Sequence, residues 1–161
     1  MREHLKHYIG GRWVESEGGE RHEVINPATE EPVTAITLGT AADVDKAVAA
    51  AREAYESFSQ TSVEDRLALL QRIADEYKAR MGDMAKAISE EMGAPISFAG
   101  AAQAPAGLGH FLATAKALKD FAFEEQIGKA TVLHEPIGVV GLITPWNWPV
   151  NQINAKVAPC I

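Results

Sequence analysis

The sequence is poor in cysteine, in long apolar runs and in positive charge. Cys160 is the only cysteine among 161 residues, so no intrachain disulfide can form. No apolar run approaches the roughly 18 to 20 residues of a membrane-spanning helix, and the first residues, MREHLKHYIGG, have no apolar signal core. Basic residues number 15 against 22 acidic ones, and the net charge of -7 argues against a nucleic-acid or membrane partner. These absences favour a cytoplasmic globular protein.

Two kinds of binding motif are also missing. The five histidines are scattered and form no Cys/His cluster at ligand spacing, so we expect no metal site. The glycines of GLGH at 107–110 and of GVVG at 138–141 lack the spacing of a dinucleotide fingerprint between a strand and a helix. A glycine-rich Rossmann turn is therefore not predicted in this chain.

The first third of the chain is typical of short strands separated by turns. Gly10 and Gly11 lie between two apolar-aromatic pieces in HYIGGRWVES, which indicates a β-hairpin. The pairs Asn26-Pro27 and Glu31-Pro32 mark turns, because the residue before a proline is held extended.

Two amphipathic helices are predicted next. Apolar residues recur from Asp43 to Phe58 with 4-3-4-3 spacing, and Thr40 or Asp43 can cap the start. The stretch SVED at 62–65 resembles a capping box, with Asp65 in the position usually held by Glu or Gln. One apolar face then continues through Val63, Leu67, Leu70, Ile73, Ala74, Tyr77, Met81, Met84, Ile88 and Met92.

Glycine and proline bound the second helix and a third. Gly93 and Pro95 predict the end of the second helix, and Gly82 is expected to weaken or divide it, since glycine costs about 1 kcal/mol relative to alanine there. The small residues of PISFAGAAQAP predict a connector. The third helix is expected to begin near Pro105 and to bury Leu108, Phe111, Leu112, Ala115 and Leu118.

The carboxyl-terminal part returns to an extended pattern. Thr131 to His134 predicts a strand, and Ile137 to Thr144 predicts an apolar strand of the kind buried on both faces of a parallel sheet. Val150 to Pro159 predicts the opening turns of a helix. A strand, turn and helix in this order begin a nucleotide-binding unit, so the predicted fold class is α/β.

Two residues near this turn are candidates for chemistry. Cys160 is the only thiol, but its neighbours are apolar, and we predict a small buried core residue rather than a nucleophile. Asn147 lies between two tryptophans in TPWNWP, where a strand is expected to end. Its amide could donate to a developing oxyanion, because ligands bind at the carboxyl ends of such strands. Alternatively, Asn147 caps the helix near Val150 and the tryptophans fill the core.

The segment EPIGVVGLITPWNWPVNQINAKVAP strongly resembles the aldehyde dehydrogenase superfamily around its proline-tryptophan-asparagine-aromatic-proline segment. YIGGRWVES, INPATEEPV, DVDKAVAAAREAY and RLALLQRIADEYKAR are similar to earlier segments of the family, in the same order. The resemblance covers nearly the whole chain. It implies the amino-terminal part of the family fold: short strands, three helices, an oligomerisation-arm strand and the first strand–turn–helix of the cofactor-binding sheet.

The resemblance also implies roles for five residues. Asn147 matches the asparagine that stabilises the oxygen of the thiohemiacetal, for which loss of one donor typically raises the barrier by about 2.7–4 kcal/mol. The residues that match the loop along NAD or NADP are Ile143, Thr144, Pro145 and Trp146.

A division of the chain follows from the same resemblance. Residues 1–120 are expected to form the amino-terminal strands and the helical part of the cofactor domain. Residues 121–136 match the arm that joins the oligomerisation sheet, and residues 137–161 match the start of the cofactor-binding unit, truncated.

The catalytic cysteine of the family lies far downstream of its asparagine, whereas Cys160 follows Asn147 by only thirteen positions and does not inherit that role. The family's general-base glutamate also belongs beyond Ile161. The implied activity is oxidation of a small aldehyde by NAD(P)+ and water in a homo-oligomer, and the 161-residue chain is expected to be inactive alone. The alternative is a non-enzymatic remnant of a truncated gene that self-associates.

Overall fold

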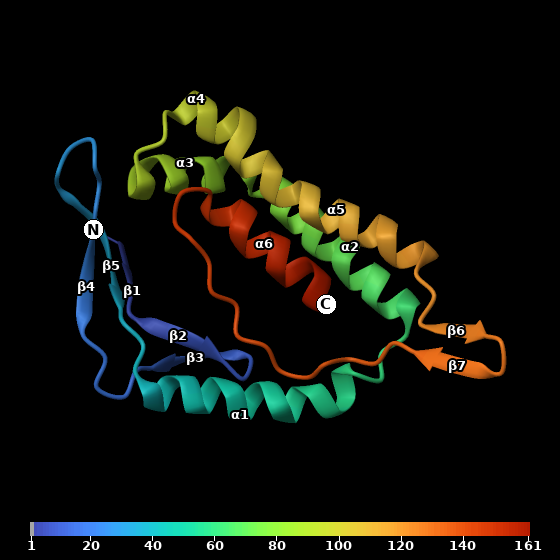
Figure 1. The fold of residues 1–161 in the computed structure, drawn as a ribbon. Helices are drawn as coiled ribbons and strands as arrows, with labels where there is room; N and C mark the ends of the chain where they lie inside the picture. The colour runs from blue at the N-terminus through green and yellow to red at the C-terminus, as the bar shows by residue number, and fades with distance from the viewer. Residues whose placement is uncertain (1) are drawn as a thin grey trace.

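The protein combines three small sheets with a layer of packed helices (Figure 1). The structure, a computed structural model, describes residues 2–161. The strands are β1 (Arg2–His4), β2 (Lys6–Ile9), β3 (Arg12–Glu15), β4 (Arg21–Ile25), β5 (Pro32–Thr37), β6 (Glu124–Ile127) and β7 (Ala130–Leu133). The helices are α1 (Ala41–Phe58), α2 (Val63–Ala79), α3 (Met81–Met92), α4 (Ile96–Phe98), the π-helix η1 (Ala99–Gln103), α5 (Ala104–Asp120) and α6 (Pro149–Cys160). The fold is therefore mixed α/β, as predicted.

The amino-terminal strands form two sheets. β2 and β3 pair antiparallel across Gly10 and Gly11, whose φ angles of 59° and 76° suit the tight hairpin turn that the sequence predicts. β5 lies between β1, which is parallel to it, and β4, which is antiparallel. The turns predicted at Asn26-Pro27 and Glu31-Pro32 lie between the end of β4 and the start of β5.

Local capping chemistry fixes the starts of α1 and α2. Thr40 and Asp43 form a reciprocal capping box at α1, and Ser62 and Asp65 form one at α2. The predicted second helix is divided as expected, with the break at Arg80, immediately before α3. Gly93 ends α3 in the left-handed conformation, at φ 81°.

The predicted connector before the third helix is wrong, because that segment is helical. α4 begins at Ile96 and continues through η1 into α5. Pro105 has no N–H to donate, and within a regular helix its ring would crowd the carbonyl of Ala101. The wider π-turn, in which the N–H of Ala104 donates to the carbonyl of Ala99, accompanies this proline.

Helix packing forms two buried clusters. One joins α3, η1 and the start of α6 through Ala85, Ile88, Ala94, Ala99, Ala104 and Val150. The other joins α2, α5 and the end of α6 through Leu70, Ala74, Phe111 and Ala158. The α2–α3 face was predicted correctly, whereas Leu112 of the predicted α5 face is 50% exposed, and the buried Gly107 takes part in that face instead.

The predicted strand from Ile137 to Thr144 is also wrong for this chain. The whole connection from His134 to Asn147 contains no helix or strand, and Ile137 and Ile143 are 92% and 90% exposed. A strand requires a hydrogen-bonded neighbour, and no strand of residues 2–161 pairs with this segment. In Figure 1 it runs from β7 along α1 to the start of α6, and the Tyr55 hydroxyl of α1 donates to the carbonyl of Pro136 at 3.1 Å.

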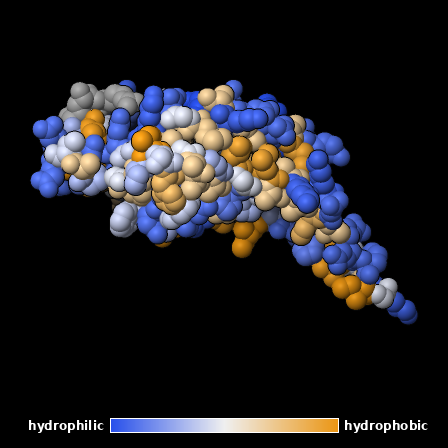
Figure 2. All heavy atoms as spheres, turned by 90° about the horizontal axis from the view of Figure 1, so that it is seen from above, coloured by the Kyte–Doolittle hydropathy of each residue, from blue (hydrophilic) through white to orange (hydrophobic). Residues whose placement is uncertain are grey.

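β6 and β7 form a hairpin that projects from one end of the molecule. All of their residues are exposed, including Ile127 at 63% and Leu133 at 58%. The strand predicted at Thr131–His134 corresponds to β7. Figure 2 shows apolar side chains at the surface of both the body and the projecting arm. None of the helices within residues 2–161 is long and apolar enough to span a membrane.

Candidate functional site

The segment from Ile143 to Asn147 leads directly into α6, which is held firmly by its neighbours. Helix α6 packs along α5, where Nε2 of His110 lies 2.7 Å from Oδ1 of Asn151. Nδ2 of Asn154 donates to the carbonyl of Gly107 at 3.2 Å. The first turn of α6, which contains Asn151, is therefore a packed platform for the residues that precede it, and the Asn154 contact lies in the next turn.

Asn147 is exposed on this platform, two residues before Pro149 begins α6. The position before α6 is occupied by Trp148, and no side chain caps the helix there. The alternative role of Asn147 as a helix cap is therefore not realised. Its side-chain amide has no hydrogen-bond partner among residues 2–161, whereas its backbone carbonyl accepts from Nε2 of Gln103 at 3.2 Å.

The four residues predicted to lie along a cofactor are also exposed. Ile143 is 90% and Trp146 77% exposed, so Trp146 does not fill a core. Trp148, by contrast, packs edge-to-face on Phe98, with ring centroids 5.6 Å apart. The structure thus brings the predicted site residues together on one open stretch, anchored by the second tryptophan.

A cavity of about 620 Å³ adjoins this stretch. Thr144, Pro145 and Trp146 form one wall, and residues of β4, α3 and α6, apolar except for Glu91, form most of the rest. Neither Ile143 nor Asn147 lines it. The cavity shows that one side of the loop faces the body of the chain and the other side faces solvent.

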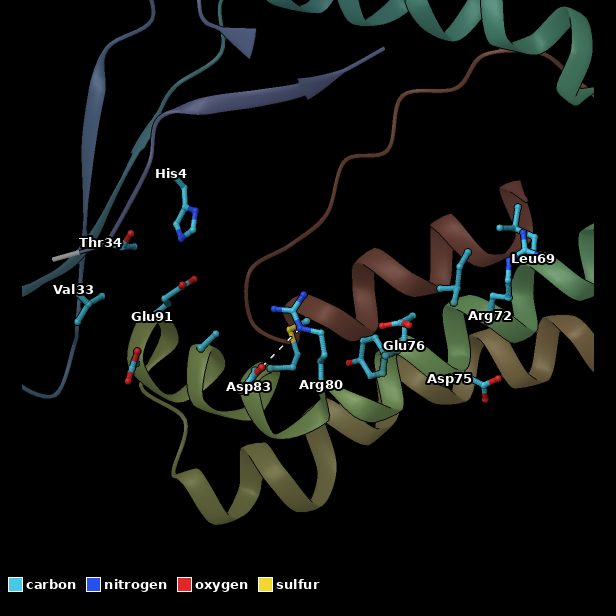
Figure 3. Close-up of a pocket in the computed structure, with 15 residues that line it drawn as sticks. His4, Val33, Thr34, Leu69, Arg72, Asp75, Glu76, Arg80, Asp83 and Glu91 are labelled. Atoms are coloured by element: carbon cyan, nitrogen blue, oxygen red, sulfur yellow. Dashed lines mark ion pairs between the residues drawn. The ribbon is translucent and has the colours of Figure 1, made fainter. Parts of the chain in front are cut away.

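A larger cavity, of about 870 Å³, lies away from the loop and contains none of its five predicted residues. Figure 3 shows His4, Val33 and Thr34 on the strand side and the charged side chains of α2 and α3 on the other side. Acidic and basic groups are mixed there, as in the Arg80–Asp83 ion pair at 3.7 Å, and no group of His, Cys, Asp or Glu within residues 2–161 suits a metal ion. We therefore place the candidate site at the loop, not in the larger cavity.

The carboxylate with the clearest pKa shift is Asp43, and its contacts stabilise the fold and lie away from the loop. Asp43, 4% exposed, accepts from the Ser16 hydroxyl at 2.5 Å and from the backbone N–H groups of Thr40 and Glu17 at 2.9 and 3.1 Å. These hydrogen bonds, that from Ser16 above all, hold the pKa of Asp43 well below its usual range. His7 lies nearby, but its Nε2 is 3.8 Å from Asp43, and Ser16 donates to the aspartate rather than to the imidazole. The group lacks the serine–histidine contact of a hydrolytic triad and instead ties β3 to α1.

The prediction that Cys160 is buried is wrong. Cys160 is exposed at the end of α6, because the neighbouring Ala158 occupies the face that packs against α2 and α5. Arg66 of α2 donates to the backbone carbonyl of Ile161 and so also holds this end of the helix.

Sequence reasoning missed Gln103, which contacts the loop from η1. It is 2% exposed, and it lay in the segment that the sequence predicted to be a connector. The available signal was a polar residue two positions before a proline inside an alanine-rich stretch of high helix propensity.

Comparison with known proteins assigns the fold to a family. The model of the "Aldehyde dehydrogenase family" matches residues 13–161. The chain belongs to the aldehyde dehydrogenase family. It is 53% identical to 3-succinoylsemialdehyde-pyridine dehydrogenase of Pseudomonas sp., a match that covers 100% of this chain and 34% of that protein. It is 51% identical to a putative aldehyde dehydrogenase of Staphylococcus aureus, over 98% of this chain and 33% of that one.

Solved aldehyde dehydrogenases have the same fold over this region. The crystal structure from Bartonella henselae matches with a TM-score of 0.96 and 43% identity, over 99% of this chain and 34% of that chain. A cysteine-to-alanine mutant of aldehyde dehydrogenase C (AldC) from Pseudomonas syringae, complexed with NAD+ and octanal, matches with a TM-score of 0.95 and 46% identity, over 97% and 32% of the two chains. The chain thus spans about a third of the length of the relatives it matches, and it corresponds to their amino-terminal portion.

Proposed function

We propose that this chain contributes the cofactor-facing loop and one oxyanion donor to an aldehyde dehydrogenase that converts an aldehyde, NAD(P)+ and water to a carboxylic acid and NAD(P)H. The observation that carries the proposal is Asn147, exposed and without a side-chain partner at the start of a rigidly packed helix. The second support is membership of a family in which the AldC structure contains both NAD+ and octanal.

Asn147 acts through its side-chain amide. Negative charge grows on the carbonyl oxygen of an aldehyde when a thiolate attacks it, and a fixed N–H donor lowers the energy of that state. Because the Trp148–Phe98 contact holds the backbone next to Asn147, less ordering of the donor is needed during the reaction.

The loop from Ile143 to Trp146 would hold the cofactor. Its residues are exposed and belong to no helix or strand, so backbone groups and the apolar face of Trp146 are available to a planar, polar ligand. When bound, NAD(P)+ supplies the hydride acceptor. Trp146 would exclude water from the side of the cleft that it covers, and the choice between NAD and NADP is left to residues outside this segment.

The three predicted parts of the chain have separate roles in this proposal. Residues 1–120 support the cofactor loop, residues 121–136 form an arm that joins subunits in a homo-oligomer, and residues 137–161 begin the cofactor-binding unit. The exposed β6–β7 hairpin supports the second role, because its apolar residues Ile127 and Leu133 are 63% and 58% exposed.

The experiment is a chimera in which this chain replaces the matched third of AldC, assayed with octanal and NAD+. We expect octanal-dependent NADH formation by the chimera and none by the 161-residue chain alone, because the family resemblance places the nucleophile and the base outside this segment. A folded but inactive chimera would contradict the proposed role of the segment, and activity of the isolated chain would contradict the assignment of the nucleophile elsewhere.

A second candidate function is self-association of the chain without catalysis. It is favoured by the exposed apolar residues of the connection between β7 and α6, especially Ile137 and Ile143. Sedimentation of the purified chain as a compact monomer would contradict this candidate.

A further inference from the structure

Gln103 is buried, and only one of the two polar atoms of its side-chain amide has a hydrogen-bond partner among residues 2–161. Nε2 donates to the backbone carbonyl of Asn147 at 3.2 Å, although the two residues are far apart in sequence. Oε1 is buried and has no hydrogen-bond partner among residues 2–161. A reversed amide would place two oxygen atoms against each other, so the contact itself fixes the orientation of the side chain. A buried acceptor without a partner is unfavourable. Its presence at Oε1 directs attention to the hydrogen bond that Nε2 makes with Asn147.

The π-turn explains how Gln103 reaches the loop. Residues five apart come closer to a common face in a π-turn than in an α-helix, because the hydrogen bond spans five residues. Phe98 and Gln103 are five apart, and they contact two consecutive residues: Phe98 packs on Trp148 and Gln103 donates to Asn147. Two residues of α4 and η1 therefore contact two adjacent residues immediately before the start of α6.

We propose that Gln103 is a positioning residue for Asn147, an inference that rests on the proposed oxyanion role of Asn147. With its carbonyl held by Gln103, the peptide between Asn147 and Trp148 cannot rotate freely. Trp148 is fixed by Phe98, and Pro149 restricts the next φ angle. With the backbone held in this way, the position of the Asn147 amide depends only on the χ angles of its side chain. The amide is preorganised to that extent as a donor.

The first test measures order at Asn147 in the full 161-residue chain by NMR relaxation. Gln103→Met keeps the length of the side chain and removes the donor. Asn154→Leu is the matched control, because Asn154 is also a buried amide, 8% exposed, that donates to a backbone carbonyl at 3.2 Å. We expect the order parameter of the Trp148 N–H, which belongs to the peptide group whose Asn147 carbonyl accepts from Gln103, to fall from about 0.85 to about 0.6 or lower in Gln103→Met and to stay unchanged in Asn154→Leu.

Three results would overturn the inference. They are a mobile Trp148 N–H in the unsubstituted chain, an unchanged order parameter in Gln103→Met, and an equal loss of order in both variants. If Gln103→Met does not fold, Gln103→Glu replaces it at a pH at which its carboxyl is ionised, since a carboxylate of similar shape has no proton to donate to the Asn147 carbonyl.

The second test uses the AldC chimera and separates positioning from stability. We expect Gln103→Met to lower kcat about 10- to 100-fold with KM for NAD+ nearly unchanged, because misplacement of a catalytic group by about 1 Å can cost on the order of 10²-fold. Asn154→Leu should stay within about twofold. In Gln103→Glu, kcat relative to the unsubstituted chimera should rise as the pH falls, because only the protonated carboxyl can donate.

These outcomes separate the two proposals. Equal kcat values for Gln103→Met and Asn154→Leu would overturn the positioning role even in an active chimera. A folded but inactive chimera would reject the proposed function, while the order parameters would still decide whether Gln103 holds Asn147.

Discussion

Replacement of Gly107 by alanine tests how α5 packs against α2 and α6. Gly107 lies in α5 beside Tyr77 of α2 and Asn154 of α6. A Cβ built there would be 2.8 Å from Nδ2 of Asn154 and still closer to the Tyr77 hydroxyl. Neither group can retreat freely, because Tyr77 donates to the carbonyl of Ala104 at 2.8 Å and Asn154 donates to that of Gly107.

The expected magnitude follows from three opposing effects. Overpacking typically costs about 1–3 kcal/mol, and leaving a buried hydrogen-bonding group unsatisfied costs about 1–3 kcal/mol. Alanine in place of a helical glycine returns up to about 1 kcal/mol. We therefore expect Gly107→Ala to lower the free energy of unfolding by about 1–6 kcal/mol.

Gly109→Ala is the matched control, two residues further along the same helix. A Cβ at Gly109 meets nothing within 4 Å, so the propensity gain is unopposed, and we expect stability to rise by up to about 1 kcal/mol. Urea unfolding of both variants, followed by circular dichroism and tryptophan fluorescence, gives the two free energies. Equal stability of Gly107→Ala and Gly109→Ala would refute the account of how α5 holds α6.

Two further predictions concern the elements that precede these helices. The pKa of Asp43 is lowered in the folded state, so its ionised form stabilises the fold above the unfolded pKa of about 3.9, and this contribution is lost as the pH falls through the lower folded value. Asp43→Asn should therefore be less stable than the unsubstituted chain at pH 5–8, and the gap should shrink below about pH 4 in thermal unfolding; a gap independent of pH would contradict the assignment. Ser62→Ala removes the cap of α2 and should lower the free energy of unfolding by about 1 kcal/mol in urea. An unchanged free energy of unfolding would show that the hydrogen bond from the Asp65 N–H to the Ser62 hydroxyl contributes nothing.

The parts of the fold that the sequence predicted correctly depend on local chemistry. The hairpin at Gly10 and Gly11 needs only two residues with positive φ. The starts of α1 and α2 need only a hydroxyl and a carboxylate three residues apart, as at Thr40 and Asp43.

The errors come from contacts that the local sequence does not contain. The apolar run at 137–144 has strand composition, but a strand is made by its neighbours, and none pairs with it here. The burial of Cys160 depended on which face of α6 packs on α5 and α2, and that face includes Ala158 instead. Gln103 became recognisable only when the π-turn brought it to the carbonyl of Asn147.

The candidate site was predicted from resemblance more than from physical reasoning. A turn at TPWNWP and a helix beginning near Val150 follow from the residues, and the structure begins α6 at Pro149. The oxyanion role of Asn147 and the cofactor role of residues 143–146 remain predictions, supported by exposure and by the rigid helix behind them.

The most direct test of the central claim is the rate of the chemical step in the AldC chimera with Asn147→Ala and Asn147→Asp. Both substitutions remove the amide donor, and Asn147→Asp does so with almost no change of shape. The account predicts that kcat falls about 10²- to 10³-fold in both, with the affinity for NAD+ unchanged. A kcat within about twofold of the unsubstituted chimera in either variant would contradict the assignment of Asn147 as an oxyanion donor.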